Sequence, residues 1–168
     1  MVLYGTIYRI DGAISSAQVV PPAMAQADPA ELAAACLAQA DPAAGDALAE
    51  GGVLLVGGAL GHGADAELAV LALQALGVAA AICAEADPAF GQAAGAYGLP
   101  VLAAPQAASA LPHGALVRID LAKGLVEDRG GGARYPAAPL PPAALAAARR
   151  AALLGHMRRA VEDEDLGG

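Results

Sequence analysis

The residues from 51 to 67, GGVLLVGGALGHGADAE, predict more about the fold than any other part of the chain. The apolar run from Val53 to Val56 predicts a strand that is covered on both faces, because it has no solvent-facing side. The loop that follows is rich in glycines, which permit tight turns and close approach to a ligand: Gly57, Gly58, Gly61 and Gly63. From Ala64 onward the spacing is helical, with Asp65 and Glu67 in the first turn. A strand, a glycine loop and a helix start together form an anion-binding arrangement.

Outward from this segment, strands and helices continue to alternate. A helix from Asp65 to Leu76, ended by Gly77, and a buried strand from Val78 to Cys83 would complete a right-handed βαβ unit. Other predicted elements are a strand over 3–10, an extended piece ending at 19–22, a helix capped by Asp28 and running to Ala40, a short helical stretch from Asp41, a helix from Asp87, a strand over 99–102, a β pair over 115–121 and 125–126, and a terminal helix from Pro141 through Ala160. The fold class is therefore α/β, with a partly parallel sheet flanked by helices and a C-terminal helix.

The length and charge of the chain restrict its organisation and its partners. We expect a single domain over residues 1–160 and an acidic, flexible tail over 161–168, since 168 residues are too few for two comfortable domains. The net charge is -8, which gives no electrostatic footprint for nucleic acid or for an anionic membrane. Arg9 is the only Lys or Arg before Arg118. A small anion bound in this region would have to rely on backbone amides or on a partner chain.

A membrane span is an alternative interpretation of the uncharged run from Leu68 to Ala84. Its length approaches the roughly 20 residues that a spanning helix needs, but Gln74, Gly77 and many alanines weaken that interpretation. Glu67 and Glu85 bracket the run where aromatic or basic anchors would be expected. The N-terminus has no basic start before an apolar core, and Cys36 and Cys83 both lie in apolar surroundings. We therefore expect a reduced protein of the cytoplasm.

The order of these pieces resembles the small subunit of 3-isopropylmalate dehydratase, the swivel-domain partner within the aconitase superfamily, and the likeness covers nearly the whole chain. Each local match is weak alone, but the set occurs in the family's order: Val19-Val20-Pro21, Asp28-Pro29-Ala30-Glu31-Leu32, the strand and loop over 53–63, Gly98-Leu99-Pro100, the turn over 119–124, and Leu140-Pro141-Pro142. The resemblance implies an aconitase swivel-like β/β/α domain that takes part in leucine biosynthesis. It also implies a separate large subunit that carries a [4Fe-4S] cluster, no cofactor in this chain, and a small dicarboxylic acid as substrate.

The substrate loop departs from the family pattern at the reactive positions. The family's loop reads roughly Gly-x-Gly-Ser-Ser-Arg-Glu, in which a serine is the proton-transfer base and the arginine binds a substrate carboxylate. The corresponding residues here are Gly61, His62, Gly63, Ala64, Asp65, Ala66 and Glu67. Ala64 and Ala66 can neither take a proton nor pair with a carboxylate. The acidic Asp-x-Asp pattern that the family places before Val19 is also replaced, by Ser15-Ser16-Ala17.

Few other side chains could take over the chemistry. His62 is a weak candidate for the catalytic residue, since it titrates near neutrality between two glycines, although a solvated loop histidine is the simpler interpretation. The non-aromatic hydroxyls are Thr6, Ser15, Ser16 and Ser109. For Ser15 and Ser16 a turn-forming role is favoured, because a serine is a poor base without a neighbour that stabilises its alkoxide. Three scattered histidines and two cysteines predict no metal site.

Two functional hypotheses follow. The chain is either the swivel subunit of an active hydro-lyase of the isopropylmalate dehydratase type, which closes over the large subunit's iron-sulfur site, or a catalytically inert swivel paralogue with a structural or regulatory role. A free-standing binder of a small ligand at the glycine loop has less support. The family likeness favours the first hypothesis, whereas Ala64 and Ala66 favour the second.

Overall fold

The computed structural model describes the backbone of residues 1–167 and the side chains of residues 1–155. Seven strands form one mixed sheet in the order β4-β3-β2-β1-β5-β6-β7. Four of them are parallel: β1 (Val2–Ile10), β2 (Val53–Leu60), β3 (Ala80–Ala86) and β4 (Val101–Ala103). The remaining three continue the sheet as an antiparallel meander: β5 (Leu116–Asp120), β6 (Leu125–Asp128) and β7 (Arg134–Pro136).

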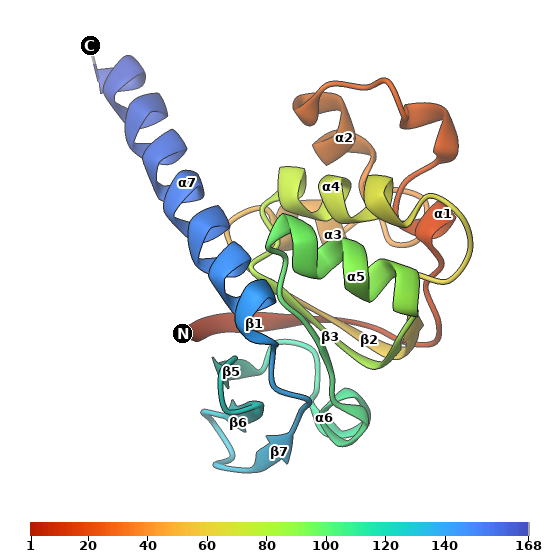
Figure 1. Ribbon diagram of the computed structural model, residues 1–168, viewed down its shortest axis with the longest axis vertical. Coiled ribbons are helices and arrows are strands. Elements are labelled where there is room, and N and C mark those ends of the chain that lie inside the picture. Colours follow the sequence, from red (N-terminus) through yellow and green to blue (C-terminus); the bar gives the residue numbers. More distant parts are fainter. Residues whose placement is uncertain (168) are drawn as a thin grey trace.

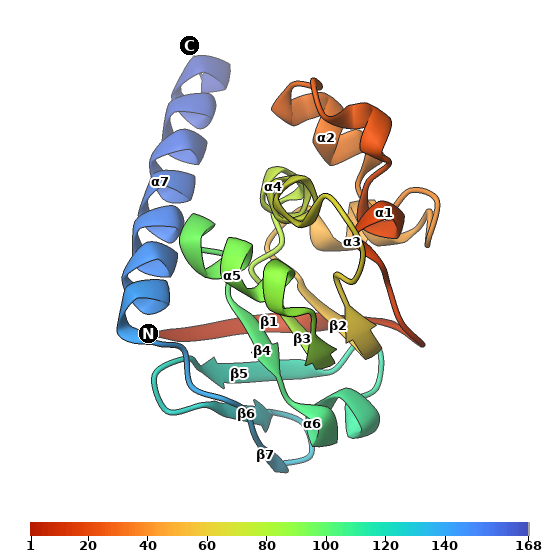
Figure 2. The same cartoon turned by 45° about the vertical axis from the view of Figure 1, so that its right-hand side comes forward.

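Helices cover both faces of the parallel half of the sheet (Figures 1 and 2). One face carries α1 (Ser16–Val19), α2 (Pro29–Ala35), α3 (Ala44–Leu48), α4 (Ala66–Leu76) and α5 (Pro88–Tyr97), together with the 3-10 turn η1 (Pro22–Met24). The opposite face carries α6 (Pro105–Ala110). The terminal helix α7 (Pro142–Gly167) packs along α5.

The apolar run in β2 divides its side chains between two hydrophobic clusters. Leu54 and Val56 belong to the cluster under α1–α5, whereas Val53 and Leu55 belong to the cluster shared with α6, β5 and β6. All four side chains are fully buried. This alternation explains why the sequence shows no polar position in the strand: side chains point to opposite faces, and both faces are covered. The prediction of a doubly covered strand is confirmed.

The predicted βαβ unit is present. Strands β2 and β3 pair in parallel, with Val53 opposite Ala80, and α4 connects them. Gly77 ends α4 in the left-handed conformation, and its N–H bonds to carbonyls of the last turn. The uncharged run that also suggested a membrane span is thus divided between a helix and a strand. Among the described residues, no helix combines the length and the apolar character needed to cross a bilayer.

Two expectations for the first fifty residues were wrong in detail. The segment expected to be extended before Pro21 contains the helix α1, because Ser15 and Gln18 form a reciprocal capping box that starts a helical turn. Within 19–22, Val20 and Pro21 have extended backbone, whereas Val19 ends α1 and Pro22 begins η1. Helix α2 ends at Ala35 rather than Ala40, since Leu37 has a positive φ of 60° and its N–H bonds to the carbonyl of Val19 instead.

Other differences concern the ends of elements and two short pieces. Strand β2 continues through Gly57 and Gly58 to Leu60, so the loop starts later than expected. Helix α6 and strand β7 had no predicted counterpart. Helix α7 extends to Gly167, beyond the expected end at Ala160. The flexibility of the tail over 161–168 stays a prediction, because its side chains and Gly168 lie outside the described part of the chain.

Candidate substrate loop

The loop between β2 and α4 is held by the segment that follows β1. The N–H of Gly61 donates to the carbonyl of Ile14 at 2.8 Å. The buried hydroxyl of Ser16 donates to the carbonyl of Gly61 at 2.7 Å, and the N–H of Ser16 donates to the carbonyl of His62 at 2.9 Å. These three bonds fix the backbone of the loop at the carboxyl edge of the parallel strands, where open α/β sheets place their ligands.

Gly61 is the residue at which the loop turns away from β2. Its φ is +88°, a conformation that side chains other than glycine rarely adopt. A Cβ at this position would overlap the ring of Phe90, which is fully buried beneath the loop. Gly61, which was predicted to let a ligand approach the loop closely, is therefore also required for packing against α5.

The side chains that the loop presents to solvent are chemically poor. His62, Gly63, Ala64 and Asp65 are exposed, and Ala66 is partly buried as the first residue of α4. Of these side chains only His62 carries an imidazole, the group that most often acts as a general acid or base in enzymes. The structure therefore brings the predicted loop residues 61–65 together. Among the described neighbours, no side chain adds a base or a cation to them.

The first turn of α4 leaves backbone amides free within the helix. The first hydrogen bond inside α4 runs from the N–H of Ala69 to the carbonyl of Asp65, at 3.1 Å. Amides before Ala69 have no intrahelical acceptor, as at any helix start. Asp65 sits at the cap position in the left-handed conformation, with φ of 64°, and its side chain caps none of these amides. The amides could face an anion, but the carboxylates of Asp65 and Glu67 oppose one.

Arg9, the only Lys or Arg in the first 117 residues, is committed to structural contacts. Its Nε donates to Asp11 Oδ1 at 2.7 Å. Its Nη1 donates to the carbonyls of Ala108 and Leu111, at 2.6 and 2.9 Å, and so caps the end of α6. These bonds hold Nε and Nη1 of the guanidinium against Asp11 and the end of α6, so Arg9 does not replace the arginine that the family's loop would carry.

The two candidate serines have structural roles. Ser15 is the N-cap of α1 and accepts a hydrogen bond from the N–H of Gln18. Ser16 is fully buried and holds the loop, as described above. The turn-forming interpretation is therefore supported for Ser15. For Ser16 the contact to Gly61 joins residues 45 apart in the chain, and no local pattern in the sequence could have indicated it.

A polar cluster at the end of β1 was missed by the sequence interpretation. The hydroxyl of Tyr8 donates to Asp41 Oδ2 at 2.7 Å, and its ring meets the ring of His113 edge to face at 4.8 Å. Nδ1 of His113 accepts from the N–H of Arg9 at 3.2 Å. Burial, reinforced by the hydrogen bond to Asp41 and its negative charge, raises the pKa of Tyr8 to about 12. The cluster ties the start of α3 and the loop before β5 to β1.

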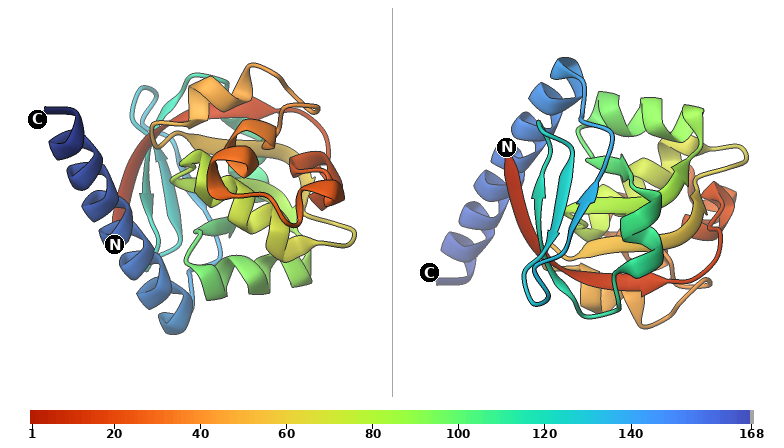
Figure 3. Two further views of the ribbon diagram at one scale, coloured as in Figure 1. Left: turned by 90° about the horizontal axis from the view of Figure 1, so that it is seen from above. Right: turned by 90° about the horizontal axis from the view of Figure 1, so that it is seen from below.

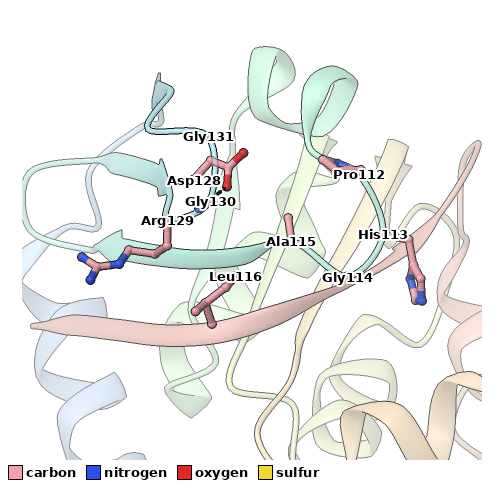
Figure 4. Close-up of a pocket in the computed structure, with 9 residues that line it drawn as sticks. All are labelled: Pro112, His113, Gly114, Ala115, Leu116, Asp128, Arg129, Gly130 and Gly131. Atoms are coloured by element: carbon pink, nitrogen blue, oxygen red, sulfur yellow. Dashed lines mark hydrogen bonds between the residues drawn. The ribbon is translucent and has the colours of Figure 1, made fainter.

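A shallow groove of about 460 Å³ lies on the antiparallel half of the sheet and shares no residue with the substrate loop. It is formed by residues 112–116 and 128–131 (Figure 4). Arg129 and His113 point away from one another in this view, and Asp128 bonds to the N–H of Gly130. The guanidinium of Arg129 lies over the ring of Tyr4, 5.7 Å from its centre. The polar groups do not converge, so the groove has no evident chemistry.

The described residues do not fit a metal or an iron-sulfur cluster. No group of three or more His, Cys, Asp or Glu side chains among them could hold a metal ion. Cys36 and Cys83 are buried, and burial raises the pKa of both thiols to about 12, with a smaller contribution from Glu85 at Cys83. A thiol that stays protonated is a poor metal ligand.

Comparison with known proteins identifies the relatives of this chain. No family model matches it. The 3-isopropylmalate dehydratase small subunit of Moorella thermoacetica is 31% identical over 143 residues, which cover 84% of this chain and 86% of that protein. The small subunit of Aquifex aeolicus is 26% identical over 139 residues, which cover 82% and 83%. A crystal structure of 3-isopropylmalate dehydratase (leuD) from Methanocaldococcus jannaschii matches over the full length of both chains, with a TM-score of 0.80 and 22% identity.

The full-length structural match and the sheet order define the class: a mixed α/β domain with a partly parallel sheet, flanking helices and a C-terminal helix. The extent and level of the match to the Moorella protein then place it more narrowly. The chain belongs to the family of 3-isopropylmalate dehydratase small subunits, homologous to the small subunit of an aconitase-type hydro-lyase.

Proposed function

We propose that this chain is a swivel subunit that docks on a large subunit of the isopropylmalate dehydratase type and positions the loop over 61–65 without supplying a catalytic base or a substrate-binding cation. The observation that carries the proposal is a contrast within one loop. Its backbone is fixed by Ile14 and Ser16, whereas its exposed side chains are those of His62, Ala64 and Asp65. The loop therefore keeps the backbone contacts that hold it in place but lacks the reactive side chains of the family pattern.

The loss of both groups has a large expected consequence. General acid-base catalysis contributes roughly a hundredfold to ten-thousandfold in rate, and an alanine at position 64 forfeits it. An alanine at position 66 forfeits the bidentate pairing that an arginine makes with a carboxylate. In the partner, a [4Fe-4S] cluster would act on a small malate-like diacid. This chain would contribute the backbone wall of the site, the α4 amides and the exclusion of water.

A second candidate function rests on His62. Its imidazole is exposed between two glycines, and the carbonyl of the same residue is held by the N–H of Ser16. In an active subunit His62 would take the place of the missing serine as the proton-transfer base, and the large subunit would supply the cation. This candidate predicts substantial turnover that depends on His62.

Reconstitution separates the candidates. The chain is co-expressed with a cluster-bearing large subunit under anaerobic conditions, the complex is isolated by affinity and size-exclusion chromatography, and turnover of 2-isopropylmalate is measured. An ordinary small subunit with Ser-Ser-Arg in its loop, paired with the same large subunit, is the positive control. The proposal predicts a stable complex with turnover at least about a hundredfold below that control.

Three other outcomes contradict parts of the proposal. Turnover similar to the control would overturn the inert assignment, and its loss in His62→Gln would establish the histidine mechanism. The same turnover retained in His62→Gln would assign the chemistry to the large subunit. Failure to form any complex, with the chain folded by circular dichroism, would favour a free-standing binder of a small ligand.

A further inference from the structure

One half of the sheet has a side that the described chain leaves uncovered. Helices α1–α5 lie over the parallel half, and no described helix lies over the same side of β5 and β6 (Figures 2 and 3). Val2 and Tyr4 share this side of β1 with Tyr8, which packs under the helices, and Thr6 on the same side lies opposite Leu116 of β5. Val2, Tyr4 and Leu116 are 37%, 59% and 51% exposed. We call this surface the open face, and it consists of Val2, Tyr4, Leu116, Arg118 and Arg129.

The open face is basic, although the chain as a whole carries a net charge of -8. The guanidinium of Arg129 lies 5.7 Å from the centre of the Tyr4 ring, so a positive charge stands beside the apolar side chains. Arg118 follows Leu116 by two positions in β5 and therefore points to the same side. Glu127 lies opposite Arg118 on β6, yet neither arginine forms an ion pair with another described residue. A surface that carries carboxylates would complement this face.

Helix α3 borders the open face and has the opposite charge. It contacts β1, and its Leu48 belongs to the same hydrophobic cluster as Tyr8, so the helix lies on the same side of the sheet. Its exposed charged residue is Asp46, and the exposed Glu50 follows the helix two residues after its end. We call Asp46 and Glu50 the acidic edge. The sequence holds no Lys or Arg between Arg9 and Arg118, and the acidic edge forms no ion pair within the described residues.

The order of charges across this side of the molecule is self-complementary. It runs from the acidic edge, through Tyr4 and Leu116, to the arginines of the open face. A two-fold axis reverses this order in a second copy, so each acidic edge meets the arginines of the other copy and the apolar side chains meet at the centre. The helix α3 of each copy then covers the half of the sheet that has no helix of its own. Both partners of this charge pairing are present in one chain, so a second copy supplies what the open face lacks.

We propose that the open face and the acidic edge together form an interface with a second copy of this chain, related by two-fold symmetry. The exposed tyrosine and leucine supply the buried contact. The carboxylates and arginines set the orientation of the two copies, which is the usual contribution of charge at an interface. Tyrosine and arginine are also residue types that often carry much of the binding energy. The inference does not depend on the proposed function, because none of these residues belongs to the candidate loop over 61–65.

The first test uses the full chain in analytical ultracentrifugation at concentrations up to sub-millimolar, at which a dimer is expected. Tyr4→Ser removes the central apolar contact and should weaken the dimer by about tenfold or more. Tyr97→Ser is the matched control, because Tyr97 is 41% exposed at the end of α5, outside the proposed interface, and its replacement should leave the dimer unchanged. Circular dichroism confirms that each variant keeps its fold.

Charge reversal tests the pairing of the acidic edge with the arginines. The variant with Asp46→Arg and Glu50→Arg has two basic surfaces, and the variant with Arg118→Glu and Arg129→Glu has two acidic ones. Each alone should dimerise more weakly by about tenfold or more. An equimolar mixture should restore association as a heterodimer, since opposite charges then face one another at both contacts. Arg129→Glu alone replaces the double variant if a second glutamate opposite Glu127 prevents folding.

A monomer at every concentration would overturn the proposal. Assemblies that keep growing with concentration would also overturn it, because a two-fold contact closes at the dimer. Equal effects of Tyr4→Ser and Tyr97→Ser, or a mixture of the charge variants that associates no more tightly than each alone, would contradict the interface described. Association seen only with a large subunit would assign the open face to that partner instead.

Discussion

The hydroxyl of Ser16 donates a 2.7 Å hydrogen bond to the carbonyl of Gly61, and both residues are buried. This contact joins the segment after β1 to the start of the candidate substrate loop. Because water has no access to either group, the bond has no ready substitute. The position of the loop thus depends on a buried side chain from another segment of the chain.

The substitution Ser16→Ala leaves the buried carbonyl of Gly61 without this donor. The expected cost is about 1–3 kcal/mol of unfolding free energy, the penalty of an unpaired buried polar group. Urea denaturation measures it, and amide exchange should show faster opening at Gly61 and His62. Ser109→Ala is the matched control, because Ser109 is exposed on α6, and it should change stability by less than about 0.5 kcal/mol. Equal effects of the two variants would contradict the role given to Ser16.

The two glycines that flank His62 predict different tolerance of a side chain. Both have positive φ, +88° at Gly61 and +92° at Gly63, but only a Cβ at Gly61 meets another atom, in the ring of Phe90. Gly63→Ala should cost only the backbone strain of about 1–2 kcal/mol. Gly61→Ala adds an overlap and should cost about 1–3 kcal/mol more.

Thermal unfolding of the two variants tests this difference. In a double-mutant cycle, Phe90→Ala should relieve part of the cost of Gly61→Ala and none of the cost of Gly63→Ala. Additive effects at Gly61 and Phe90 would show that the loop accommodates a side chain without contact to α5, contrary to the structure.

Both thiols should be inert in the folded protein. Burial raises the pKa of Cys36 and Cys83 to about 12, so almost no thiolate forms near neutral pH. A chromogenic disulfide reagent should therefore label neither cysteine in native buffer and both in denaturant. Rapid labelling of one thiol at pH 8 would show that its surroundings open in the native state.

The Tyr8–Asp41 contact predicts a loss of stability at alkaline pH. Since burial and Asp41 raise the pKa of Tyr8 to about 12 in the folded state, above its ordinary value of 10.0, folding favours the neutral phenol. This contribution is complete below about pH 10 and is lost as the pH rises through about 12. Tyr8→Phe should remove the pH-dependent component and cost about 1 kcal/mol at neutral pH. Urea denaturation at a series of pH values compares the two proteins, and parallel curves above pH 10 would contradict the assignment.

Elements with strong local signals in the sequence were predicted correctly. Each of these signals lies within a few residues: the apolar run Val53–Val56 for β2, Gly77 after a helical spacing for the end of α4, and the Asp87 cap for the start of α5. All three elements are present. Helix α1 was missed because it has only four residues, which is too short for a helical spacing to be seen around its capping box. Strand β7 was missed because its three residues are extended only by pairing with β6.

The sequence predicted where residues 61–65 lie in the fold, but not the contacts that hold them there. Residues 61–65 lie together at the carboxyl edge of the sheet, and the absence of a base or arginine could be seen directly in Ala64 and Ala66. The long-range hydrogen bonds of Ser16 and Arg9 could not be predicted from the sequence, because each joins residues at least 45 positions apart. Ser16 bonds to Gly61, and Arg9 bonds to Ala108 and Leu111. Long-range contacts of single polar side chains leave no periodic signal in a sequence.

The most direct test of the central claim is turnover of 2-isopropylmalate by the reconstituted complex after Ala64→Ser and Ala66→Arg are introduced together. If the loop keeps its geometry and lacks only its reactive groups, this variant should gain at least about a hundredfold over the unmodified chain. The swapped variant, with Ala64→Arg and Ala66→Ser, has the same composition and should gain nothing. Equal turnover of the unmodified chain and the restored variant, or equal gain in the swapped variant, would contradict the claim that this loop is an intact frame without its chemistry.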